Sequence, residues 1–358
     1  MRAGLAPGNE IYFDRRGMSY RRISVFIPPF LLICMVAAIA AGVQLYASPP
    51  GGLQLPVATE GEGDMRIRTG SANYPRQAID SDGITVNVAR PTHRIVSQYW
   101  SIDEYLYSVV PPQDVVAVSE SAYLKSVSNV YEQVQRFHPV VATDPERVLA
   151  LNPDLMLVSS SGPADYTSLV RSTGVPVYSM QVSFQTLAQV EQTIRLTGYL
   201  TGNDEAAEKE AARFQAEIAQ AKALRPPNAP KPRILGLGDR FSYGKETLFG
   251  DIVTTLGGIN VAAENGLRGY DSINFEQIIR WNPEWIIAEA DPGKEKEVIA
   301  NLLADPAIAL TQAARNGHIV VFDNHVFLPM SPYTTLLVRA MAEAIYGNSR
   351  SASAESHE

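Results

Sequence analysis

Glu146–Val158 reads ERVLALNPDLMLV, and Glu276–Ala288 reads EQIIRWNPEWIIA. The two stretches align without a gap at an offset of 130 residues, sharing Glu, Asn and Pro, an acid after the Pro, and apolar pairs elsewhere. In each copy the Glu begins a short helix, Asn-Pro ends it, and the following apolar residues form a strand buried on both faces. A repeat at this distance is too long for a solenoid and fits two similar α/β domains. We therefore expect two lobes that hold something between them.

The composition excludes several classes of protein. With 358 residues and 46% apolar content, the chain has room for two cores. The net charge of -8 argues against a nucleic-acid surface. A single Cys allows no intramolecular disulfide and no Cys-based zinc site. The five His residues are scattered without an H-x-x-x-H pair, so we expect no metal site and no resident cofactor.

The amino terminus has the layout of an export signal or a membrane anchor. Several arginines precede an uncharged apolar run from Ile23 to Ala47, and translation from Met1 or from Met18 would retain this run. Cleavage near Ala47 and retention as an anchor both stay open, because at ~1.5 Å per residue the run can cross a bilayer. Cys34 is an unfavourable lipidation site because Ile33 precedes it. Either outcome predicts a periplasmic location for the rest of the chain, free or tethered by residues 23–47.

The longest helix signal joins the two halves. Asn203 to Leu224 places Ala207, Ala211, Phe214, Ile218 and Ala221 on one face, with Asn203 or Asp204 as a cap. We expect an α/β fold of two similar lobes with mainly parallel sheets joined by this one long helix, although an ordinary surface helix of one large domain is the alternative. The expected divisions are a signal peptide or anchor (1–47), a flexible linker (48–73), an N-terminal lobe (74–202), a bridging helix (203–226), a C-terminal lobe (227–348) and a disordered tail (349–358).

Strand and helix signals alternate within each half. The first half opens with a hairpin signal around Asp82-Gly83. Further elements are expected as strands at 94–97, 115–118, 175–178, 233–237 and 318–322, and as helices at 102–110, 247–256 and 333–346. This rhythm predicts a parallel sheet with right-handed crossovers in each lobe.

The frame resembles a known family, the helix-bridged substrate-binding proteins (class III periplasmic binding proteins) of ABC importers for iron-siderophores, haem and cobalamin. The likeness covers about Tyr74 to Gly347 and rests on Arg94–Ser97, Glu146 with Asn-Pro-Asp154, Gly244-Lys-Glu246, Leu256–Asn260, and Glu276 with Asn-Pro-Glu284. In that family one Glu of each lobe docks into basic pockets of the permease dimer, so the resemblance assigns docking to Glu146 and Glu276. The alternative is that each Glu only favours its helix amino terminus, worth about 0.3–1 kcal/mol.

A ligand is expected at the carboxyl ends of the strands. The predicted ligand-binding residues are Tyr99, Trp100, Ser159, Ser160, Arg240, Phe241, Tyr243, Tyr270 and Phe327. Aromatic walls with a few polar groups suit a large planar or chelate ligand. Arg240 and Arg268 can meet an anion or remain solvated. Haem would need a Tyr or His axial ligand, for which His138, His325 and Tyr243 are candidates, with an ordinary hydrogen-bonded role favoured for each.

The favoured function is a monomeric, non-enzymatic receptor that captures a metal chelate, foremost a ferric siderophore, and delivers it to an ABC permease dimer. Haem and cobalamin are alternative ligands. A second hypothesis is an exported enzyme, but the chain has no G-x-S-x-G, P-loop, H-E-x-x-H or G-x-G-x-x-G motif, and Gly236-Leu-Gly238 is only a weak fragment. A third is a membrane-tethered sensor or interaction domain that does not transport.

Overall fold

The structure is a computed structural model that describes residues 74–135, 144–239 and 241–354, with side chains described to residue 347. All of these residues belong to one compact unit. The predicted signal or anchor, the linker, His138 and Arg240 lie outside the described residues. Within the described ranges, no helix combines the length and the hydropathy needed to cross a membrane.

The N-terminal lobe (N-lobe) is built on a four-stranded parallel sheet in the order β4-β3-β5-β6. Its strands are β3 (Ile95–Ser97), β4 (Val115–Ala117), β5 (Leu155–Ser159) and β6 (Val177–Met180). Its helices are α2 (Trp100–Val109), η1 (Pro112–Asp114), η2 (Glu120–Tyr123), α3 (Tyr131–Val134), α4 (Pro145–Ala150), α5 (Ala164–Ser172) and α6 (Leu187–Thr201). The predicted hairpin precedes it as antiparallel β1 (Arg76–Ile79) and β2 (Thr85–Val88), turning through Gly83 at φ 78°.

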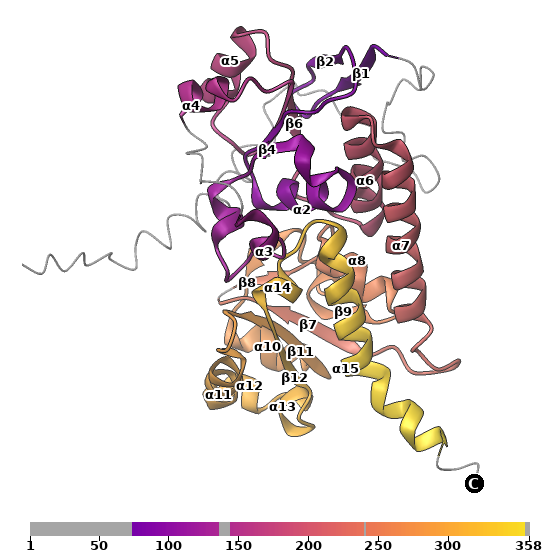
Figure 1. The fold of residues 1–358 in the computed structure, drawn as a ribbon. Coiled ribbons are helices and arrows are strands. Elements are labelled where there is room, and N and C mark those ends of the chain that lie inside the picture. The colour runs from indigo at the N-terminus through magenta and orange to yellow at the C-terminus, as the bar shows by residue number, and fades with distance from the viewer. Residues whose placement is uncertain (1–73, 136–143, 240, 355–358) are drawn as a thin grey trace, which may run out of the picture. The chain divides into compact units, whose positions relative to one another are not determined.

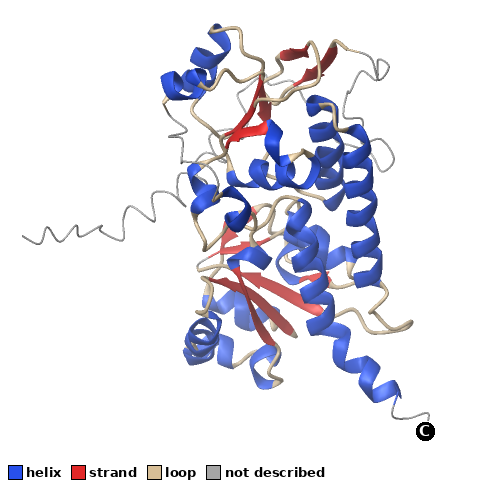
Figure 2. Ribbon diagram, in the orientation of Figure 1, coloured by secondary structure: helices blue, strands red, loops and turns tan. Residues whose placement is uncertain are grey.

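The C-terminal lobe (C-lobe) repeats this topology and adds to it. Its strands are β7 (Arg233–Leu237), β8 (Phe241–Tyr243), β9 (Ile259–Asn260), β10 (Tyr270–Ser272), β11 (Trp285–Ala290) and β12 (Ile319–Asp323). The parallel strands β9, β7, β11 and β12 neighbour one another in the same chain order as β4, β3, β5 and β6. The antiparallel strands β8 and β10 extend the sheet to six strands. The prediction of two similar α/β lobes with mainly parallel sheets is confirmed (Figure 2).

Helices cover the C-lobe sheet and end the chain. They are α8 (Leu248–Thr255), α9 (Val261–Glu264), α10 (Phe275–Trp281), α11 (Glu295–Ala304), α12 (Pro306–Ala309), α13 (Gln312–Arg315), α14 (Asn324–Phe327), η3 (Pro332–Thr334) and α15 (Thr335–Ala354). The last helix continues to Ala354, so residues 349–354, which we expected in a disordered tail, are helical.

The bridging helix is α7 (Asp204–Lys222), and it contacts α6 and α2 of the N-lobe and α15 of the C-lobe (Figure 1). It buries Ala207, Ala211, Phe214 and Ala221, which is the face expected from the sequence. Of the two expected caps, Asn203 occupies the N-cap position, but its side chain makes no capping hydrogen bond and its amide donates to Thr201.

Helix α6 was not predicted, although it packs along the length of α7 (Figure 1). Its amino terminus carries a capping box between Thr186 and Gln189, and its last turn closes on Gly202 at φ 81°. Both are recognisable sequence signals. With α7 it builds one hydrophobic cluster that continues from Leu106 of α2 to Val338 of α15 and Phe249 of α8.

The repeated stretch folds in the same way in both lobes. Asn152 and Asn282, which follow α4 and α10, take left-handed backbone conformations at φ 47° and 44°. The acid after the Pro then accepts from the backbone at the start of the first strand. Asp154 accepts from the amides of His93 and Arg94 at 2.9 Å, and Glu284 accepts from the amide of Arg233 at 3.1 Å.

An arginine at the start of the first strand of each lobe donates hydrogen bonds to carbonyls at the end of the helix. Arg94 donates from Nε to the carbonyls of Leu151 at 2.9 Å and Asn152 at 3.1 Å, and Arg233 donates to the carbonyl of Trp281 at 3.3 Å. These carbonyls have no partner inside the helix, so a cation there satisfies them. The repeat is therefore a helix–turn–strand unit locked to the first strand of its own lobe.

Candidate ligand-binding site

The aromatic residues predicted for the C-lobe form one ring cluster around Tyr243. The ring centroid of Tyr243 lies 5.3 Å from Phe241, 5.5 Å from Tyr270 and 5.5 Å from Phe327. Phe249 of α8, which we did not predict, joins the cluster 5.1 Å from Tyr243. Such tilted and edge-on contacts each add about 0.5–1.5 kcal/mol beyond area burial.

One glycine in strand β7 and one directly after it leave room for these rings. A Cβ at Gly236 would fall 2.6 Å from the Phe249 ring and 2.7 Å from the Tyr243 ring. A Cβ at Gly238 would fall 2.4 Å from the Phe241 ring. The fragment Gly236-Leu-Gly238 thus serves ring packing, which is a structural reason for its two glycines.

Exposure separates the four predicted aromatics of the C-lobe. Tyr243 and Phe327 are only 6% and 7% exposed, so they are core residues that support the cluster. Tyr270 is 42% exposed, and Phe241 is partly exposed. The surface available to a ligand on this edge is therefore that of Tyr270 and Phe241.

A carboxylate, Glu289 of β11, lies in this ring cluster. The hydroxyl of Tyr243 donates to Oε2 of Glu289 at 3.2 Å. Burial raises the pKa of Glu289, and burial together with the nearby Glu289 charge raises the pKa of Tyr243 well above its ordinary value. Sequence reasoning missed Glu289. The available signal was an acid inside an otherwise apolar strand.

The N-lobe residues of the prediction stand at the ends of its strands. Tyr99 and Trp100 open α2 directly after β3, partly exposed, with ring centroids 6.0 Å apart. Ser159 ends β5 and is 8% exposed, and its Oγ accepts from the amide of Ser161. Ser160 is partly exposed, and its backbone amide donates to the carbonyl of Met180 at 2.9 Å. Ser159 is the counterpart of Glu289, because the two positions are separated by the repeat offset.

The remaining polar candidates have local partners. Arg268 pairs with Glu246, so its charge is compensated on the surface. The His325 ring lies 3.4 Å from Asp323, the residue that caps α14. His138 and Arg240, outside the described residues, stay predictions.

Helix α2 buries two carboxylates, of which Glu104 joins the N-lobe to Ser331 of the C-lobe. Glu104 accepts from Asn129 at 2.9 Å and from the Ser331 hydroxyl at 2.6 Å, and the same Asn129 amide donates to the carbonyl of His325 at 3.1 Å. Asp103 accepts from Ser119 at 2.6 Å, which caps η2. Burial raises the pKa of each carboxyl to about 7. The sequence analysis did not predict a role for either carboxyl.

Glu146 and Glu276 occupy equivalent places on the two lobes. Each is an exposed residue in the first turn of its helix, following the cap residue Asp144 or Asn274. Neither forms an ion pair within the part of the chain that the structure describes. A helix that turns directly into a parallel strand runs opposite to it, so its start lies toward the carboxyl edge of the sheet. We therefore expect both glutamates to lie toward the edge that carries the predicted ligand residues.

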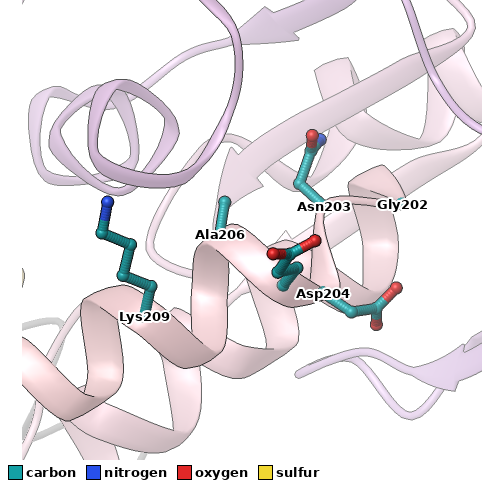
Figure 3. Close-up of a pocket in the computed structure, with 6 residues that line it drawn as sticks. Gly202, Asn203, Asp204, Ala206 and Lys209 are labelled. Carbon is teal, nitrogen blue, oxygen red and sulfur yellow. The ribbon is translucent and has the colours of Figure 1, made fainter.

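A surface hollow of about 390 Å³ lies elsewhere, along the first turns of α7 (Figure 3). It is lined by Gly202, Asn203, Asp204, Glu205, Ala206 and Lys209. None of the predicted ligand residues lines it. Asp204 is already held by Arg76 at 2.6 Å, so the feature is a crevice at a helix start.

Known proteins share this architecture. A cobalamin-binding protein of Halobacterium salinarum is 25% identical over 282 residues, which cover 77% of this chain and 75% of the relative. The solved periplasmic heme-binding protein RhuT from Roseiflexus sp. RS-1 is 27% identical with a TM-score of 0.61, covering 72% of this chain and 98% of its own. A possible iron-binding protein of Staphylococcus epidermidis shares the fold at 20% identity and a TM-score of 0.63, covering 72% of this chain and 100% of its own. The family model for periplasmic binding proteins matches residues 95–326. The chain therefore belongs to the periplasmic binding protein family.

Proposed function

We propose that the protein captures a metal chelate outside the cytoplasm, between the carboxyl edges of its two sheets, and delivers it to an ABC importer. The observation that carries the proposal is the partly exposed aromatic surface of Tyr270 and Phe241, supported from below by Tyr243 and Phe327. Rigid rings backed by a core offer a large apolar contact at little entropic cost. Tyr99, Trp100, Ser159 and Ser160 would supply the opposite wall.

Delivery requires a second contact, and we assign it to Glu146 and Glu276. Both carboxylates are exposed, toward the ligand edge, and at matching positions in the repeat. Two such charges on separate lobes can meet two basic pockets of a permease dimer at once, with charge-assisted pairs that fix orientation.

The ligand classes to be compared are ferric siderophores, haem and cobalamin. The related proteins are named for cobalamin and heme, whereas our prediction, which rests on the family resemblance, placed a ferric siderophore first. Haem ligation by Tyr243 is disfavoured, because its hydroxyl is buried, bonded to Glu289 and held in the protonated form by its raised pKa. A Tyr ligand to ferric iron must lose that proton.

A thermal-shift panel tests the proposal on the purified protein with ferrichrome, haemin and cyanocobalamin, and with a ferric salt as control. A ligand at 100 times its Kd stabilises the folded state by about 2.7 kcal/mol, so at least one chelate should raise the Tm. A Tm unchanged by all three would contradict the proposal for these classes.

Tryptophan fluorescence locates the site. The chain has three tryptophans, and Trp100 stands at the predicted site while Trp285 stacks on His318 at 4.0 Å, at the start of β11. We expect a bound chelate to alter the emission of the wild type, and Trp100→Phe to remove most of that change. Trp285→Phe is the matched control. If the change in emission persists in Trp100→Phe and disappears in Trp285→Phe, the ligand binds instead at the start of β11, at the amino-terminal edge of the C-lobe sheet.

A further inference from the structure

We infer that Glu289 is the polar ligand contact of the C-lobe, and that it selects chelates presenting N–H or O–H donors, such as carboxamides, over chelates presenting carboxylates. This inference rests on the proposed function and specifies the ligand chemistry of the same site. The aromatic surface alone assigns no role to Glu289.

The position of Glu289 in β11 directs it to the ring cluster. Alternate residues of a strand point to opposite faces. Ile286 and Ala288 pack into cores on one side of the sheet, while Ile287 packs with Tyr243 and Phe327 on the other. Glu289 follows Ile287 by two residues, and its bond to Tyr243 confirms the same side. It also lies next to the end of the strand, where the ligand is expected.

The carboxylate is not explained by packing. Residues 286–288 of β11 are buried and apolar, and a carboxylate near such a core is costly unless it is paired. The only hydrogen bond that the described residues give Glu289 is the one from Tyr243 to Oε2, which leaves Oε1 without a described partner. Two described cations elsewhere in the C-lobe, Arg268 and Lys294, pair with other acids, Glu246 and Glu297.

The direction of the Tyr243 bond decides what the ligand must offer. The Tyr243 hydroxyl gives its proton to Glu289, so this pair has an acceptor left and no donor. A ligand N–H or O–H can satisfy that acceptor with a charge-assisted bond. A ligand carboxylate at the same place would be repelled in a site of reduced dielectric. Cyanocobalamin presents peripheral carboxamides and ferrichrome presents peptide N–H groups, whereas haemin presents two carboxylates.

The N-lobe supplies a comparison at the matching position. Ser159, the counterpart of Glu289, is 8% exposed and its oxygen already accepts from Ser161. Near the end of equivalent strands, the N-lobe therefore has a hydroxyl, that of Ser159, whose oxygen already accepts a hydrogen bond. The C-lobe has the carboxylate of Glu289, in which Oε1 has no described partner. Selection by charge is accordingly a property of the C-lobe wall.

The test compares the wild type with Glu289→Gln by titration calorimetry of cyanocobalamin, ferrichrome and haemin. Gln keeps the shape and one acceptor oxygen but removes the charge. We expect the wild type to bind a neutral chelate more tightly than haemin, and Glu289→Gln to weaken that chelate about tenfold while improving haemin binding. Glu343→Gln, at an exposed acid of α15, is the matched control and should leave all three affinities unchanged.

The outcomes separate the two proposals. Tightest binding of haemin by the wild type, or a neutral chelate bound equally by wild type and Glu289→Gln, overturns the inference and leaves the proposed function standing. Binding of no chelate by the wild type overturns the proposed function and the inference with it. A melting curve of Glu289→Gln that matches the wild type shows that a lost affinity is not a folding defect.

Discussion

In the N-lobe, Asp154 holds the amides of two residues at the start of the first strand, and in the C-lobe Glu284 holds one. In both lobes an arginine of the same segment, Arg94 or Arg233, donates hydrogen bonds to carbonyls at the end of α4 or α10. At this amino-terminal edge of the sheets the two lobes are built alike. The repeated contacts join helix, turn and strand, so they maintain the frame of each lobe.

At the carboxyl edge the lobes differ. The N-lobe buries Asp103 and Glu104 of α2, while the C-lobe adds β8 and β10 with their aromatic rings. The helices that carry Glu146 and Glu276 differ as well, since Phe275 beside Glu276 is 62% exposed where the N-lobe has Pro145. The comparison shows that the frame was kept, whereas the surfaces for which we propose ligand and partner contacts diverged.

The largest expected effect concerns docking. We expect Glu146→Ala with Glu276→Ala to reduce chelate uptake by more than tenfold in proteoliposomes containing the cognate importer, because removing one member of a buried charge pair costs about 2–5 kcal/mol. Of the single variants, Glu276→Ala should cost more, since exposed Phe275 and Ile279 can exclude water around its contact.

Chelate affinity, measured on the free variants, should be unchanged, and Glu343→Ala serves as the surface control. Loss of chelate binding in either glutamate variant would place that residue in the ligand site. Equal losses for Glu146→Ala and Glu276→Ala would show that the difference in exposed apolar residues between α4 and α10 has no role.

The buried acids of α2 in the N-lobe should make the free energy of unfolding depend on pH more strongly than Asp251 of α8 in the C-lobe does. The pKa of Asp103 and of Glu104 is about 7 in the folded protein, so these carboxyls keep protons that the unfolded chain has already lost near pH 5. The free energy of unfolding should therefore fall as pH rises from about 5 to 8, by roughly 2–4 kcal/mol per carboxyl.

Urea unfolding of Glu104→Gln at pH 5 and pH 8 measures this effect. The variant should match the wild type at pH 5 and exceed it at pH 8, because its amide can still accept from Asn129 and donate to Ser331. Asp251→Asn in α8 should change the slope less, since Asp251 is only partly buried. Parallel pH curves for wild type and Glu104→Gln would refute the argument.

The smallest expected effect concerns the frame itself. Asp154→Ala leaves two strand amides without their acceptor, and Glu284→Ala leaves one. We expect losses of about 2 and about 1 kcal/mol in the free energy of unfolding, measured by urea titration. Asp154→Asn, which keeps an acceptor oxygen, should recover part of the loss. A greater loss for Glu284→Ala would show that the C-lobe depends more on this contact.

Much of the frame was predictable because its signals are local. Asn-Pro ended α4 and α10 as expected, since Pro excludes the helical conformation before it and Asn tolerates the left-handed one. The apolar face of α7 followed from helical periodicity. The alternation of strands and helices predicted the parallel strands of both sheets. The extent of α15 was misjudged because its last residues are polar, and helix α6 was overlooked despite its capping signals.

The candidate site was predictable in outline only. The aromatics after strand ends could be named from the sequence, but their sorting into core and surface depends on neighbours far along the chain. Tyr243 is buried because Phe249 and Phe327 cover it, and Tyr270 is exposed because it lies on the edge strand β10. The same holds for Glu104 and Glu289, because their hydrogen-bond partners, Ser331 and Tyr243, are distant in the sequence.

By itself the sequence determined a duplicated α/β frame, its bridging helix and the matching places of Glu146 and Glu276, because turn chemistry and periodicity act over a few residues. Only the tertiary structure decided which rings are exposed, which carboxylates are buried and which hydrogen bonds join the lobes. The reason is that burial and pairing depend on groups brought together from distant parts of the chain, as when α2 receives Ser331 across 227 residues.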